Sequence, residues 1–92
     1  MDVKTYDIWI AESDNDLEMA DVLRKKKKYN GAVFYYVQAA EKAVKGLLYL
    51  LSLQPWGHSL LNLLNECEKN GIAVKPEFID FVKQEKKARL KP

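Results

Sequence analysis

The sequence predicts an all-α protein, an up-and-down antiparallel bundle of four or five helices. Three observations support this fold class. Apolar residues recur at helical spacing along most of the chain, no stretch alternates apolar and polar residues as a half-buried strand would, and the connections between apolar segments are short. The 92 residues contain no repeat and no long linker, so we expect a single helical domain over residues 1–92.

The first two helices are predicted from spacing and from one clear break. A first helix is expected over Thr5–Lys27, and a second over Ala32–Leu53, where almost every other position is apolar or small. Asn30 and Gly31 interrupt the pattern between them. Asn30 is a favourable helix cap and Gly31 can adopt backbone angles that other residues avoid, so we expect the turn at this pair.

Two shorter helices are expected in the rest of the chain. Ser59 can cap a third helix, which Asn70-Gly71 would end with a left-handed residue. Pro76 suits the first turn of a fourth helix, and Glu77 complements its dipole. The packing residues of the fourth helix are expected to be Phe78, Ile79, Phe81, Val82 and Leu90.

Size and charge narrow the possible functions. A chain this short buries roughly 60 to 65% of its unfolded surface and is expected to be stable by about 5 to 10 kcal/mol, so dimerisation would help it. The formal net charge of +2 is too small for a broad nucleic-acid surface. The five consecutive cations Arg24 to Lys28 are interpreted as a solvated helix C-terminus, with a phosphate-binding patch as the alternative.

The sequence indicates neither a metal site nor a membrane segment. Cys67 is the only cysteine and His58 the only histidine, which is too few ligands for zinc. Cys67 is expected to be a small packing residue. No signal peptide and no membrane span is expected, so the location is predicted to be cytoplasmic and no cofactor is predicted.

The second helix carries the strongest candidate for a site. Gln38, Glu41, Lys42 and Lys45 are spaced by three and four residues, so they share one side of an otherwise apolar helix. We call these four residues the polar ridge. It is interpreted either as a groove wall whose donors meet phosphate or base edges, or as a surface containing an ordinary Glu41–Lys45 pair worth about 0.3 to 0.5 kcal/mol.

These segments together resemble a known family. The similarity involves Trp9, the segment from Asp16 to Ala20, the run from Tyr35 to Lys45, and His58-Ser59-Leu60 at the start of the third helix. The family that these segments resemble is the HEPN domain. This is the nucleotide-binding domain of higher eukaryotes and prokaryotes, and the small stand-alone prokaryotic type is the most similar. The resemblance covers nearly the whole chain.

The resemblance implies a helical bundle that dimerises and often works beside a minimal nucleotidyltransferase, in pairs like toxin and antitoxin. Many such proteins are metal-independent ribonucleases, with an arginine followed four to six residues later by a histidine. That pair is absent here, since lysines follow Arg24, and Arg89 is followed only by Leu90, Lys91 and Pro92. The segment from Arg89 resembles the short Arg-Tyr-Pro stretch of non-ribonuclease members, with Leu90 in place of the tyrosine and with Lys91 inserted before Pro92.

We therefore predict a non-catalytic module that binds a nucleotide, RNA or a protein partner and forms a homodimer. Its binding residues are predicted to be the polar ridge together with His58 and Arg89, with no catalytic residue. His58 could contact a bound phosphate or could simply cap and pack at the helix entrance. The alternatives are a ribonuclease toxin, whose histidine would follow Pro92 or be replaced by His58, and a purely structural dimerisation partner.

Overall fold

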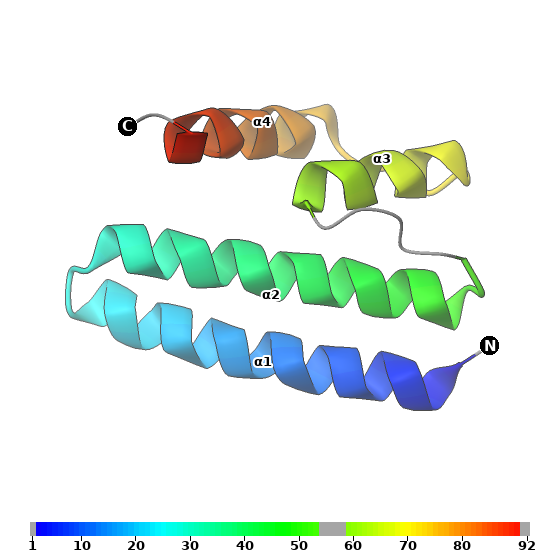
Figure 1. The fold of residues 1–92 in the computed structure, drawn as a ribbon, viewed down its shortest axis with the longest axis horizontal. Helices are drawn as coiled ribbons and strands as arrows, with labels where there is room; N and C mark the ends of the chain where they lie inside the picture. Colours follow the sequence, from blue (N-terminus) through cyan, green and yellow to red (C-terminus); the bar gives the residue numbers. More distant parts are fainter. Residues whose placement is uncertain (1, 54–58, 91–92) are drawn as a thin grey trace. The chain divides into compact units, whose positions relative to one another are not determined.

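The computed structural model describes residues 2–53 and 59–90, with side chains as far as residue 87. These residues form four helices, α1 (Val3–Lys25), α2 (Tyr29–Leu50), α3 (Leu60–Lys69) and α4 (Pro76–Leu90), in agreement with the all-α prediction (Figure 1). The chain divides into two compact units, Met1–Pro55 and Trp56–Pro92. The single domain expected over residues 1–92 therefore stays a prediction.

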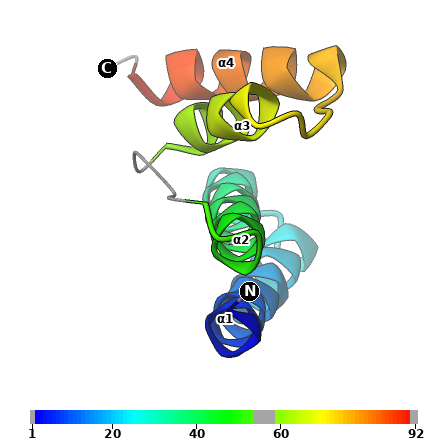
Figure 2. The same cartoon turned by 90° about the vertical axis from the view of Figure 1, so that its right-hand side faces the viewer.

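The first unit is an antiparallel hairpin of two long helices. Figures 1 and 2 show α1 and α2 side by side along their lengths. Small residues allow the helices to approach closely. A Cβ atom built on Gly46 would lie 3.0 Å from the Trp9 Cβ, and the buried Ser13 hydroxyl donates to the Ala39 carbonyl at 2.7 Å.

The predicted break at Asn30-Gly31 and the predicted start of α2 were wrong, because the break falls within the lysine run. α1 ends at Lys25, close to the predicted end near Lys27. Lys27 adopts a left-handed φ of 61°, and Lys28 is the N-cap of α2 without a side-chain cap bond. Asn30 and Gly31 instead lie in the first turn of α2. Gly31 faces Leu23, whose Cδ1 would lie 3.1 Å from a Cβ atom added to the glycine, so Gly31 provides space between the helices.

Local hydrogen bonds define the start of α1 and the end of α2. Asp2 caps α1 by accepting from the Thr5 backbone N–H at 3.0 Å, and the hydrogen bonds from the Thr5 hydroxyl and this N–H lower the pKa of Asp2. α2 ends at Leu50, three residues before the predicted end. Ser52 takes a left-handed φ of 59°, and the Leu53 N–H turns back to the Leu48 carbonyl at 2.8 Å.

The second unit confirms the predicted helix signals. The Ser59 hydroxyl accepts from the Asn62 N–H at 3.2 Å, Gly71 has a φ of 80°, and Pro76 begins α4. Cys67 is buried as expected, and burial raises the pKa of its thiol. The predicted packing face of α4 was wrong in part: Val82 is buried, but the side chains of Phe78 and Phe81 are exposed.

Candidate functional site

The polar ridge of α2 is not a solvent-exposed surface. Glu41 is buried at 8% exposure, and Gln38, Lys42 and Lys45 are half-buried. The interpretation of Glu41 and Lys45 as an ordinary surface pair was therefore wrong about Glu41. All four residues lie on one helix as predicted, but none of the four is exposed to solvent as a surface ridge would be.

The ammonium group of Lys42 is bound by α1. Its Nζ lies 2.7 Å from Asp16 Oδ2 and 3.8 Å from Glu12 Oε2. Asp16 is itself only 6% exposed, so Lys42 neutralises a carboxylate inside the hairpin. The hydrogen bond with Asp16 raises the pKa of Lys42 against the opposing effect of desolvation. Lys42 thus connects α2 to α1 and has little capacity left for an external anion.

Lys45 is also directed to α1. Its Nζ lies 5.4 Å from the centre of the Trp9 ring, which is a cation–π contact. The same ring is stacked on Tyr49, with centroids 6.3 Å apart and an interplanar angle of 10°. Both cations of the polar ridge therefore take part in the contact between α1 and α2.

Asp16 and Glu12 were not among the residues predicted for the site. A signal for Asp16 existed in the sequence, since it shares a face of the first helix with Trp9, Ser13 and Ala20. An acidic residue on such an apolar and small face indicates a buried partner of opposite charge. Nothing in the spacing of residues indicated which lysine that partner would be.

The other predicted binding residues stay predictions. His58 lies outside the described residues, and the backbone of Arg89 lies in the last turn of α4 but its side chain is not among those described. Within residues 2–53 and 59–90, no group of three histidine, cysteine or acidic side chains could hold a metal ion. None of the helices in these ranges combines the length and apolar character needed to cross a membrane.

A second cationic region lies at the turn between α1 and α2. We call Lys25, Lys26, Lys27 and Lys28 the lysine turn. All four side chains are exposed, and no carboxylate of the described residues lies within 4.0 Å of them. A shallow pocket of about 540 Å³ adjoins this turn, lined by Leu23, Lys27, Lys28, Tyr29, Asn30 and Gly31.

Comparison with known proteins identifies the family. Neither the curated proteins nor the solved structures include a significant match to this chain. The family model of the HEPN domain, however, matches residues 6–91 and so includes nearly all of the four helices. The helical hairpin with its polar ridge and the two helices that follow therefore belong together in one family pattern, and this chain is a member of the HEPN domain family.

Proposed function

We propose that this chain is a non-catalytic HEPN module that works by binding other proteins, first of all a second copy of itself. Family membership and the engagement of Lys42 and Lys45 within the hairpin support this over a reaction at the polar ridge. One observation carries the proposal furthest. It is an exposed stripe of apolar and small side chains along α1, on a face other than the one that packs against α2.

The α1 stripe consists of Ile8, Ala11, Asn15, Met19 and Val22. Ile8 is 58% exposed, Met19 42% and Val22 50%, and Ala11 and Asn15 are also exposed. At spacings of three and four residues these side chains share one face of the helix. Large apolar side chains aligned in this way favour an interface with another protein.

The α1 stripe is complementary to itself. Its successive spacings of three, four, four and three residues read the same in both directions. In an antiparallel pair of α1 helices, Ile8 would meet Val22 of the second copy, small Ala11 would meet large Met19, and Asn15 would meet its own equivalent on the two-fold axis. Such a two-fold contact uses the same surface on both copies.

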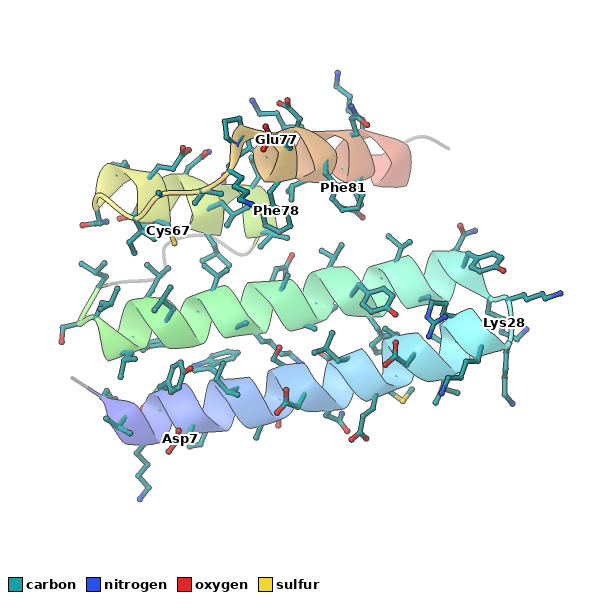
Figure 3. The ribbon with its side chains drawn as sticks, turned by 180° about the vertical axis from the view of Figure 1, so that it is seen from behind. Asp7, Lys28, Cys67, Glu77, Phe78 and Phe81 are labelled. Carbon is teal, nitrogen blue, oxygen red and sulfur yellow. The ribbon has the colours of Figure 1, made fainter. Side chains whose placement is uncertain are left out.

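Charges at the ends of the stripe agree with this arrangement. Asp7, near the start of α1 (Figure 3), would lie level with the basic last turn of α1 in the second copy, where Lys25 is exposed. The dimer is therefore expected to be held at both ends by attractions that salt screens.

We predict that I8E/V22E makes the protein monomeric, because it places two carboxylates opposite each other at both ends of the stripe. The variant I8E/V22K is expected to dimerise again, because each glutamate then meets a lysine of the second copy. Molar mass measured by light scattering after size-exclusion chromatography distinguishes these outcomes. L17E changes an exposed leucine on another face of α1 and serves as the matched control.

A monomeric wild-type protein, or a dimer that tolerates I8E/V22E, would contradict the proposed interface. The second proposed partner, a minimal nucleotidyltransferase, rests on the family resemblance and is tested by co-purification of the two proteins. Cleavage of RNA by the pure protein without metal would replace this proposal by the ribonuclease alternative.

A further inference from the structure

The cations of this chain differ in how far they are already neutralised. Lys42 is bound by Asp16, and Lys45 lies over Trp9. Arg24 lies 3.8 Å from Asp21, and Lys69 3.9 Å from Glu66. By contrast, the lysine turn places four exposed ammonium groups together without a carboxylate within ion-pair distance among the described residues. Unneutralised positive charge is therefore concentrated at this end of the hairpin.

The position of the lysine turn in the fold adds to its preference for anions. Figure 3 shows Lys28 at the end of the hairpin, where α2 begins. The first backbone bond of α2 runs from Ala32 N–H to the Lys28 carbonyl, which leaves the N–H groups of Tyr29, Asn30 and Gly31 without a partner in the preceding turn. The negative end of α1 lies in the same turn and offsets the dipole of α2, so the attraction for anions comes from the ammonium groups and from these N–H groups.

The pocket beside the lysine turn has features suited to a nucleobase as well as to phosphate. Tyr29 is 59% exposed, and the Asn30 amide beside it is exposed too. An exposed tyrosine ring offers a stacking surface for any base, and an amide can donate to and accept from base edges. The depression is shallow and open to solvent, so a base would lie against the Tyr29 ring there without being enclosed.

We propose that the lysine turn binds single-stranded nucleic acid. Phosphates lie along Lys26 to Lys28 and the first turn of α2, and a base stacks on Tyr29. This inference extends the proposed function, because it assigns a ligand to a surface separate from the α1 stripe. The exposed Tyr29 ring and Asn30 amide favour a strand that carries bases over a flat anionic membrane.

The test uses the full chain and a fluorescently labelled strand of about 12 uridines, with binding followed by anisotropy from about 50 to 200 mM salt. The variant K26Q/K27Q/K28Q is expected to weaken binding more than tenfold and to make the salt dependence shallower by about 2 logarithmic units per decade, at roughly 0.7 for each lost phosphate contact. The control K75Q/K83Q/K87Q removes the same charge from exposed lysines of the second unit and is expected to bind as the wild type does.

Tyr29 supplies an independent readout. Y29A is expected to weaken binding about tenfold and Y29F to retain it, because stacking requires the ring and not the hydroxyl. Equal losses in K26Q/K27Q/K28Q and its control would overturn the site, as would a wild-type protein that binds anionic phosphatidylserine vesicles or free ATP but not the strand. Molar mass measured on the same variants keeps a failure of the nucleic-acid site distinct from a failure of the proposed dimer.

Discussion

Lys42 of α2 and Asp16 of α1 form an ion pair inside the hairpin. A carboxylate that is 6% exposed is costly to bury unless a cation and hydrogen bonds compensate it. Lys42 supplies that compensation at 2.7 Å from the opposite helix. A change at Lys42 would therefore affect folding, so a loss of binding after such a change would not by itself show that Lys42 contacts a ligand.

We predict that K42M lowers the free energy of unfolding by about 1 to 3 kcal/mol, less than a fully buried pair would lose, because Lys42 keeps 26% exposure. Urea denaturation followed by circular dichroism measures the change. The double variant D16N/K42M should recover much of the loss, since position 16 then carries no unpaired buried charge. K4M alters an exposed lysine on α1 and should be neutral; an equal loss in K4M and K42M would argue against the pair.

At the scale of helices, two glycines of α2 perform different tasks. A Cβ on Gly31 would meet Leu23 Cδ1 at 3.1 Å, the mobile end of a side chain. A Cβ on Gly46 would meet the Trp9 Cβ at 3.0 Å and the Tyr6 carbonyl oxygen at 3.5 Å, neither of which can move without moving α1. The distance between the two helices is therefore set at Gly46.

Alanine at each glycine tests this difference. Both changes gain up to about 1 kcal/mol of helix propensity. G31A is expected to keep that gain and to be neutral or stabilising, whereas G46A should be destabilising by about 1 to 2 kcal/mol because α1 is pushed away from α2. Thermal denaturation of the two variants beside the wild type measures both effects, and a G46A protein as stable as G31A would contradict the close contact.

At the scale of the whole molecule, the Lys42 contact predicts a dependence of stability on alkaline pH. The pKa of Lys42 is raised in the folded state above its ordinary value of 10.5, so its contribution is fully present below pH 10.5 and is lost as the pH rises through the raised pKa. The difference in unfolding free energy between wild type and K42M should therefore be constant up to about pH 10 and shrink above it. A difference that stays constant to about pH 12 would contradict this assignment.

The family match and the two compact units describe the molecule at different levels. The match over residues 6–91 includes both the α1–α2 hairpin and the α3–α4 unit. The polar ridge, the α1 stripe and the lysine turn all belong to the hairpin. The proposed dimer surface and the proposed nucleic-acid site therefore both belong to the first unit, where each can be changed without changing the other.

The helical class, most of the helix signals and the family could all be predicted from the order of residues. Ser59, Gly71 and Pro76 could be assigned correctly because capping and turn preferences depend on a few neighbouring residues. The start of α2 could not be assigned in this way. Asn30 is the better cap on local grounds, yet the chain turns at Lys27 and Lys28, and Gly31 lies beside Leu23 of α1.

The roles of the charged residues, by contrast, were fixed by the packing of one helix on another. Spacing placed Gln38, Glu41, Lys42 and Lys45 together on one helix, but the contacts of the two lysines are with side chains about 30 residues earlier in the chain, which spacing within one helix does not reveal. Packing against α1 engages Lys42 and Lys45, and the geometry of the turn leaves Lys25 to Lys28 exposed. A charge acts through its nearest partners in space, and the pairing of α1 with α2 sets those partners.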